Sequence, residues 1–273
     1  MLGLCASLAF AAIGPSALLP PEAAAQSTSR AWLGIELAAR KDGKPGVTAR
    51  HVMRSSPSDT AGLKDGDVVL QVDAKAMKSP ADVIGEVRAH KPGDVLEIGF
   101  ERGGTERKAK VTLETFPGAD EILRRDKIGT FAPSLAGLVS VQGVAPASVR
   151  SLRGKVVVLD FWAGWCGVCK LVAPVLNGWQ EKRGPQGLVV VGVSSDTAEV
   201  ATKATPDFGI KYAVAVDKDQ GVFPGYGVSS LPTMFVLDKR GVVRGLEVGF
   251  DPAGLARMDA LITALLAEKA PED

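Results

Sequence analysis

Short segments of alternating apolar and polar residues run from about residue 30 to residue 115, a pattern typical of half-buried strands. We predict strands at residues 32–37, 47–53, 67–72, 95–101 and 107–113. One helix is predicted between them, because Ser79 can cap it, Pro80 suits a first helical turn, and the apolar spacing continues to about Ala89. This part of the chain therefore predicts a small β-rich unit with a single main helix.

The second half changes to continuous β-branched runs, as expected for strands buried on both faces. Strands are predicted at residues 156–161, 188–193, 213–216, 233–237 and 242–248. Helices are predicted at 168–182, where Pro174 should kink the helix, weakly at 198–204, and at the C-terminal end, where Leu255, Met258, Leu261, Ile262 and Leu265 share one face. The glycines and proline of residues 220–227 argue against a typical helix there. Alternating strand and helix patterns favour a layered α/β domain.

Length and composition agree with two globular domains joined by a linker. The chain has 273 residues, of which 46% are hydrophobic and 23% charged. We divide it into a leader (1–26), a β-rich domain (30–115), a turn-rich and charged linker with a short helical piece (116–127) and an α/β domain (128–270). The net charge is +1 with no basic patch, so neither a nucleic-acid partner nor a polybasic membrane contact is expected.

The first 26 residues have the pattern of a signal peptide. Residues 2–13 form a short apolar run, prolines follow it, and small residues end at Ala25, near which we expect cleavage. The run is short for a spanning helix, although an uncleaved membrane anchor remains open. The leader predicts a periplasmic or otherwise extracytoplasmic protein.

The cysteines carry the clearest chemical signal. Cys5 lies in the leader, whereas Cys166 and Cys169 form a CxxC pair directly after a predicted buried strand. A helix that begins here offers N–H donors and the positive end of its dipole, which favour a thiolate at Cys166. Attack by Cys166 on a disulfide, followed by resolution by Cys169, is the chemistry expected of such a pair.

Other functions of the cysteine pair are less well supported. Structural zinc needs four ligands, and the chain has no second CxxC or Cys-His pair, so no metal is expected. A protease would need a histidine near its nucleophile, but His51 and His90 both lie far upstream, and no Gly-x-Ser-x-Gly motif exists. A peroxidase of the peroxiredoxin type would have a reactive cysteine without a CxxC partner, so this function is also poorly supported.

Asp160 is the candidate acid–base residue. It lies six residues before Cys166 in an otherwise apolar strand. Burial would raise its pKa and allow it to act as a base for Cys169. The alternative is an aspartate at a strand end that is satisfied by local hydrogen bonds.

Residues 30–115 resemble a PDZ domain of the kind attached to HtrA proteases. The resemblance lies in Trp32-Leu33-Gly34-Ile35, in residues 56–69 and in Lys91-Pro92-Gly93-Asp94. It implies a groove for an extended C-terminal peptide. The N–H groups of Leu33, Gly34 and Ile35 would hold the peptide carboxylate, and Ile35, Val83 or Ile84, and Val87 would line an apolar pocket. The alternative is that these apolar residues are simply core.

Residues 126–270 resemble a thioredoxin-like domain of the TlpA/ResA type. Residues 160–170, including Trp165 next to Cys166, are similar to the thioredoxin active-site segment, and residues 128–133, 152–155 and 192–194 resemble the exported branch. Ser230-Leu231-Pro232-Thr233 implies a cis peptide before Pro232, beside the cysteines. Two departures stand out: residues 191–193 contain no lysine partner for Asp160, and Val168 replaces a proline.

The sequence therefore predicts a multi-domain protein, with a β-rich PDZ-like domain followed by an α/β thioredoxin-like domain whose central mixed sheet is flanked by helices. We expect a thiol–disulfide oxidoreductase without a cofactor other than its Cys166–Cys169 disulfide. Its partners would be protein clients, a C-terminal peptide and an unidentified electron donor. We favour a reductant, although Val168 leaves the direction open. The alternative is a PDZ-based scaffold with a vestigial thioredoxin fold.

Overall fold

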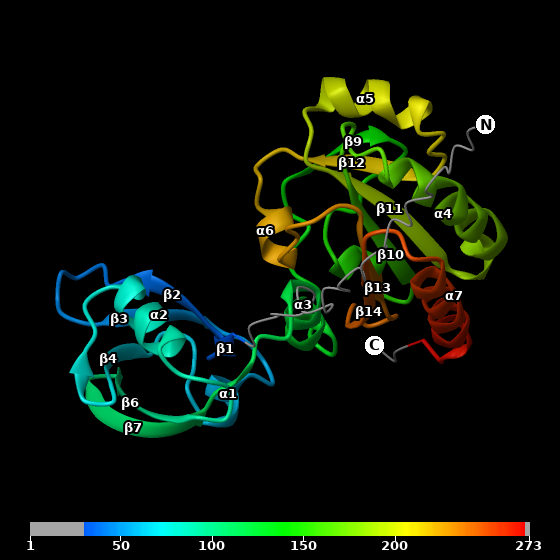
Figure 1. Cartoon of the computed structure of the whole chain (residues 1–273). Helices are drawn as coiled ribbons and strands as arrows, with labels where there is room; N and C mark the ends of the chain where they lie inside the picture. Colours follow the sequence, from blue (N-terminus) through cyan, green and yellow to red (C-terminus); the bar gives the residue numbers. More distant parts are fainter. Residues whose placement is uncertain (1–29, 271–273) are drawn as a thin grey trace, which may run out of the picture.

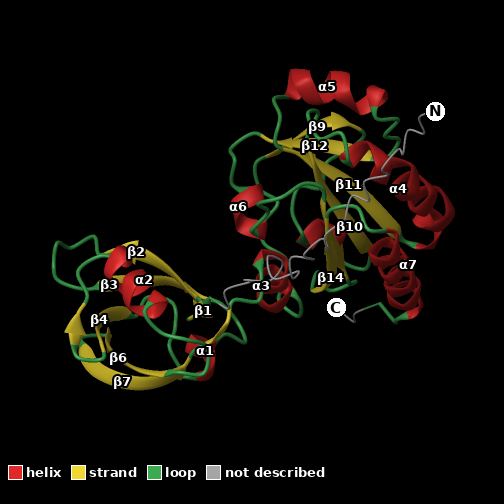
Figure 2. Ribbon diagram, viewed as in Figure 1, coloured by secondary structure: helices red, strands yellow, loops and turns green. Residues whose placement is uncertain are grey.

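A computed structural model describes residues 30–270 of the chain (Figures 1 and 2). The predicted signal peptide and its cleavage site lie outside the described residues. Within residues 30–270, no helix is long and apolar enough to cross a membrane. Two six-stranded sheets are present, one in each half of the chain, as the two hydrophobic patterns predict, and a small two-stranded sheet accompanies the first.

The first half folds into a PDZ domain around one antiparallel sheet with the strand order β2-β3-β4-β6-β7. Its strands are β2 (Ile35–Ala39), β3 (Val47–Val52), β4 (Val68–Val72), β5 (Lys75–Ala76), β6 (Val95–Arg102) and β7 (Thr105–Thr112), and its helices are α1 (Pro57–Thr60) and α2 (Pro80–Arg88). Helix α2 begins as predicted, because Ser79 accepts from the N–H of Asp82 while the Asp82 carboxylate accepts from the N–H of Ser79. Strand β2 is an edge strand, and α2 lies beside it.

The prediction of one strand at 32–37 is wrong, because two strands are present and Leu33-Gly34 separate them. Strand β1 (Ala31–Trp32) pairs with β8 (Glu114–Thr115), whereas β2 pairs with β3. Gly34 has a φ of +81°, and a Cβ there would lie 2.1 Å from the Cβ of Ser56. Glycine is therefore required at the point where the backbone turns into the edge strand.

The second half is an α/β domain with a mixed sheet in the order β14-β13-β10-β11-β12-β9. Its strands are β9 (Leu138–Gln142), β10 (Val156–Trp162), β11 (Leu188–Ser194), β12 (Ala213–Asp217), β13 (Thr233–Leu237) and β14 (Val243–Val248), and its helices are α4 (Cys169–Arg183), α5 (Ala198–Asp207), α6 (Val222–Tyr226) and α7 (Pro252–Ala267). Apolar residues of α4 and α7 cover one face of the sheet, and those of α6 cover the other. The predicted mixed sheet flanked by helices is confirmed.

Residues 220–227 contain the short helix α6, although the sequence argued against a typical helix there. Asp217 ends β12 and accepts hydrogen bonds from the N–H groups of Gly221, Val222 and Phe223, so its carboxylate satisfies the first turn of α6. The helix then ends at Gly227, which has a φ of +72°. Capping by a side chain from the preceding strand outweighs the poor helix propensity of the segment.

The linker is an ordered helix, α3 (Ala119–Lys127), that lies between the two sheets in Figure 1. Leu123 packs into the core of the α/β domain, and Arg124 donates to the carbonyl of Leu246 in β14. On the other side, Asp126 accepts from the Nε2 atom of His51 in β3 at 2.8 Å. Helix α3 therefore contacts both domains.

Candidate active site and peptide groove

The CxxC pair lies in the turn between β10 and α4. The two cysteines form a disulfide, and their Cα atoms are 5.3 Å apart. Cys166 lies in the turn, whereas Cys169 is the first residue of α4 rather than one turn into the helix as expected. The N–H of Cys169 lies 3.2 Å from the Cys166 sulfur. A donor of this kind stabilises negative charge on sulfur, so the arrangement suits a Cys166 thiolate once the disulfide is reduced.

The turn that carries Cys166 is held by the neighbouring loop after β11. Asp196 accepts from the N–H of Gly164 at 2.6 Å and from the hydroxyl of Ser194 at 2.9 Å. A Cβ on Gly164 would lie 3.0 Å from that of Ala204, so a larger residue there would crowd α5. Asp196 thus fixes the loop that presents the reactive sulfur.

Asp160 is buried in β10 on the same face of the sheet as the cysteines. Its side chain is 2% exposed, and it alternates with Val158 and Trp162, which belong to the core cluster that contains Cys166 and Cys169. Burial raises the pKa of Asp160 to about 7, although a hydrogen bond from Tyr212 lowers it. Its Oδ1 atom has no hydrogen-bond partner within the described residues. A carboxyl group with this pKa can give or take a proton at neutral pH.

Tyr212 is the partner of Asp160 that the sequence did not reveal. Its hydroxyl donates to the Oδ2 atom of Asp160 at 2.8 Å, and its side chain is 2% exposed. Tyr212 precedes β12, so its ring crosses β11 over Gly192, where a Cβ would lie 3.2 Å from the ring and 2.9 Å from the Nε1 atom of Trp162. Where the resemblance led us to look for a lysine, the chain has Gly192. The ring of Tyr212, a neutral phenol, fills the space above that glycine.

Pro232 lies next to this centre through the strand register. The Leu231–Pro232 peptide is cis, as the resemblance implied. Thr233 pairs with Phe161, so Pro232 falls beside the end of β10, where the cysteine turn begins. Pro232 is buried, and its carbonyl accepts from the N–H of Gly249 at 2.7 Å.

An apolar rim surrounds the cysteine turn. Trp165 is 75% exposed, and Val168 and Leu171 are also exposed, whereas both cysteines are buried. Exposed apolar residues that cluster in this way can contact another molecule. Trp165 therefore belongs to the exposed rim and not to the buried group around Asp160.

The predicted peptide residues meet at one cavity of about 290 Å³ between β2 and α2. Leu33, Gly34, Ile35, Val83, Ile84 and Val87 all line it. Val83 and Val87 are also members of the PDZ core, so the core interpretation holds for them as well, while Ile84 is 43% exposed. The structure thus brings the predicted groove residues together.

Backbone donors and cations lie at the same groove. Leu33 and Gly34 lie outside the strands, and their N–H groups donate to no acceptor within the described residues. Arg88 lines the cavity, and no carboxylate of residues 30–270 pairs with it. Free N–H groups and a guanidinium beside an apolar pocket suit a peptide that ends in a carboxylate.

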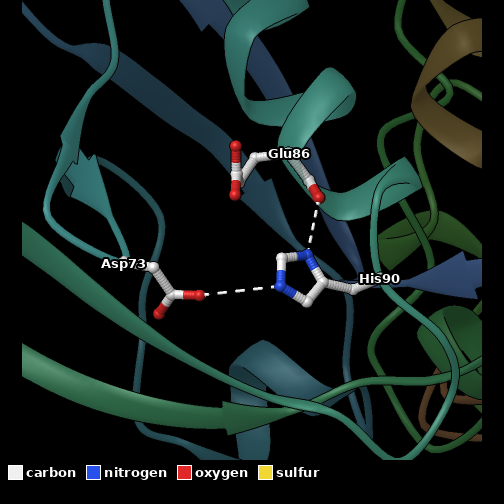
Figure 3. A group of neighbouring side chains, drawn as sticks. All are labelled: Asp73, Glu86 and His90. Carbon is white, nitrogen blue, oxygen red and sulfur yellow. Dashed lines mark hydrogen bonds and ion pairs between the residues drawn. The ribbon is translucent and has the colours of Figure 1, made fainter.

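One group of residues in the PDZ domain has the composition of a metal site. Asp73, Glu86 and His90 place possible ligand atoms within 4.8 Å of one another (Figure 3). The Nζ atom of Lys75, however, lies 2.9 Å from both carboxylate oxygens of Glu86, and the Nδ1 atom of His90 lies 2.9 Å from the Glu86 carbonyl. An ammonium already stands where a metal would need Glu86, so we assign no metal to this group.

Comparisons with known proteins agree with both halves of the structure. The AhpC/TSA family matches residues 128–246, and the PDZ domain family matches residues 31–113. The thiol-disulfide oxidoreductase ResA of Bacillus anthracis is 34% identical over 118 residues, which are 43% of this chain and 67% of that protein. Protein DipZ of Mycobacterium tuberculosis is 32% identical over 142 residues, which are 48% of this chain but 20% of DipZ.

A solved structure also resembles the second half. The thiol:disulfide interchange protein of the thioredoxin family from Chlorobium tepidum is 31% identical, covers 52% of this chain and 99% of its own, and has a TM-score of 0.44.

Proposed function

Because this chain belongs to the thiol–disulfide oxidoreductases of the ResA type and carries a PDZ domain, we propose that it reduces disulfides in client proteins that the PDZ domain recruits. The observation that carries the redox part is the Cys166–Cys169 pair at the start of α4, on the same sheet face as buried Asp160. The observation that supports recruitment is the groove with unpaired backbone N–H groups between β2 and α2.

The reaction begins from the reduced protein. The Cys166 thiolate attacks one sulfur of the client disulfide, the client S–S bond breaks, and the other client sulfur leaves as a thiolate. Cys169 then attacks the Cys166 sulfur, which releases the second client thiolate and closes the Cys166–Cys169 disulfide. The client gains two electrons and two protons, and the protein loses them. A dithiol donor of the same class must return the electrons.

Asp160 serves the second step. Cys169 must lose its proton before it attacks, and a buried carboxyl with a pKa of about 7 can accept that proton near neutral pH. Its Oδ2 atom is held by the Tyr212 hydroxyl, which leaves Oδ1 available for the proton. The transfer runs from the thiol to Asp160 through water. Trp165 and Pro232 act on the client side of the turn, where Trp165 offers exposed apolar surface and Pro232 lies beside the end of β10.

The protein acts outside the cytoplasm in this proposal. Residues 1–26 have a signal-peptide pattern, and a lone CxxC pair suits a compartment in which disulfides form and need correction.

Insulin reduction by wild type and by Cys166→Ser tests the redox function. Wild type should accelerate reduction well above the rate of the thiol donor alone, and Cys166→Ser should fall to that background. If both proteins show only background reduction, the oxidoreductase function is contradicted. The alternative, a PDZ-based scaffold with a vestigial thioredoxin fold, would then be favoured.

The equilibrium with glutathione tests the direction. A reductant should have a potential near about −270 mV, whereas a value near about −120 mV would make the protein an oxidant.

An array of C-terminal peptides, probed with the full chain, tests recruitment. We expect binding to sequences with an apolar last residue and a free carboxylate. Binding that is flat across all sequences would contradict the proposal.

A further inference from the structure

The groove of the PDZ domain is not built from that domain alone. Two residues from the segment that joins the domains, Phe116 and Ile122, line the same cavity as Ile35 and Val87. The N–H of Phe116 donates to the carbonyl of Arg30, the residue before β1, and Ile122 lies on α3. An occupant of this cavity therefore meets side chains of the linker as well as those of β2 and α2.

Helix α3 presents successive residues to different parts of the molecule. Ile122 lines the groove, whereas Leu123 packs with the core on the α6 face of the second sheet, near enough to Gly227 that a Cβ there would lie 3.0 Å from it. Arg124 donates to the Leu246 carbonyl, and its guanidinium lies 3.5 Å from Glu247 in β14. The helix that borders the groove is thus docked on the redox domain.

The other face of α3 is held by the PDZ domain. Asp126 is 8% exposed and accepts from the His51 Nε2 atom at 2.8 Å and from the N–H of Arg54 at 3.4 Å. Arg54 donates in turn to the carbonyl of Ile128 at 3.0 Å, directly after the helix. These contacts fix α3 against β3 while Ile122 faces the cavity.

We infer that α3 is a wall of the peptide groove, so that Ile122 selects the recruited C-terminal peptide and the bound peptide stabilises the docked position of α3 between the domains. This inference rests on the proposed recruitment. The occupant is an extended peptide with an apolar last residue and a free carboxylate, because the lining is apolar and Arg88 brings a positive charge without an acidic partner in residues 30–270. By linkage, whatever stabilises docked α3 also strengthens peptide binding.

The test uses the full chain and the best-binding labelled peptide from the array, with binding measured by fluorescence anisotropy. Ile122→Asp places a carboxylate in the apolar lining, and we expect its affinity to fall about tenfold or more. Ile122→Leu, which keeps an apolar side chain of similar size, should retain wild-type affinity within about threefold. Val144→Asp is the matched control, because Val144 is 86% exposed and does not line the cavity.

The circular dichroism spectrum of Ile122→Asp should match that of Val144→Asp, which shows that the variant chain is folded. If Ile122→Asp binds the peptide as well as Val144→Asp does, the inference is overturned and the recruitment proposal stands. If wild type binds no peptide of the array, both the inference and the recruitment proposal are contradicted.

Hydrogen exchange gives a second readout that does not depend on a variant. The peptide should slow exchange of the α3 amides as well as those of β2 and α2. Slower exchange in β2 and α2 alone would contradict a role for α3.

Discussion

The redox centre and the peptide groove place their key residues in opposite environments. Cys166, Cys169 and Asp160 are 5%, 4% and 2% exposed, and in the proposed mechanism each acts through its own titratable group. The groove instead relies on shared apolar surface, with Ile84 43% exposed, and on backbone N–H groups. Single substitutions should therefore abolish or greatly slow the redox reaction, whereas in the groove they should weaken binding by smaller factors and leave the chemical step unchanged.

Among substitutions that keep both cysteines, the largest effect is expected at Asp160. Asp160→Asn removes the base for Cys169, so turnover of insulin at pH 7 should fall about 100-fold, the lower end of what general acid–base catalysis contributes. The wild-type rate should rise with pH through a midpoint near the pKa of about 7, and the variant should lose this midpoint. A variant with the wild-type pH profile would exclude Asp160 as the proton acceptor.

Stability provides the control for Asp160→Asn. The folded pKa of about 7 lies above the ordinary value of 3.8, so the contribution of this carboxyl to stability is full below pH 3.8 and is lost as the pH rises through 7. The difference amounts to roughly 4 kcal/mol between these limits. Asp160→Asn should therefore be more stable than wild type in urea at pH 8, and a loss of activity could not be ascribed to unfolding.

The groove should respond more weakly. Ile84→Asp exposes a carboxylate toward an occupant that itself ends in a carboxylate, and peptide affinity should fall about tenfold. Insulin turnover should not change, because Ile84 lies on α2, in the other domain from the cysteines. A parallel loss of turnover would show that the two regions are not separable in this way.

A smaller change is expected at Tyr212. Tyr212→Phe removes the hydrogen bond that holds the Asp160 carboxylate, so the pKa of Asp160 should rise and the midpoint of the rate should move up by about one pH unit or less. A purely structural role would lower the unfolding temperature and leave the midpoint in place.

The smallest effect concerns the contact between the regions. Burial alone would lower the pKa of His51, but hydrogen bonds to Asp126 and Asp65 outweigh burial and raise it. The stabilisation from this pair is full below a pH of about 6.5 and is lost as the pH rises through the raised pKa. Proteolysis within residues 116–127 should be faster at pH 8.5 than at pH 5.5 in wild type, and equally fast at both in His51→Ala once protease rates are corrected with an unstructured peptide. A proteolysis rate of wild type that does not change with pH would contradict this role of His51.

What the sequence could predict follows the same division. Cys166, Cys169, Asp160 and Pro232 lie in local patterns, and the structure brings all of them to one end of β10. Tyr212 could not be found, because its contact with Asp160 depends on the order of β10, β11 and β12 and on the space above Gly192. Residues 191–193 lie on β11 and contain no partner for Asp160, because the donor is the residue that precedes β12.

The linker is a second case in which the sequence did not predict tertiary contacts. Its composition predicted a connection between domains with a short helical piece, and α3 is that helix. The docking of α3 and the position of Ile122 at the groove were not predicted. Local composition does not reveal which neighbours a helix meets. Similarly, the capping carboxylate of Asp217 explains α6, which a propensity argument rejected.

The most direct test of the whole account uses one disulfide-bonded client peptide in two forms. Both carry the best-binding C-terminal sequence from the array, one with a free carboxylate and one with an amidated end. If the groove recruits clients for Cys166, the free acid should have a KM at least several-fold lower at the same kcat, and Ile84→Asp should remove the difference. Equal KM values for the two forms in wild type would contradict recruitment through the PDZ groove.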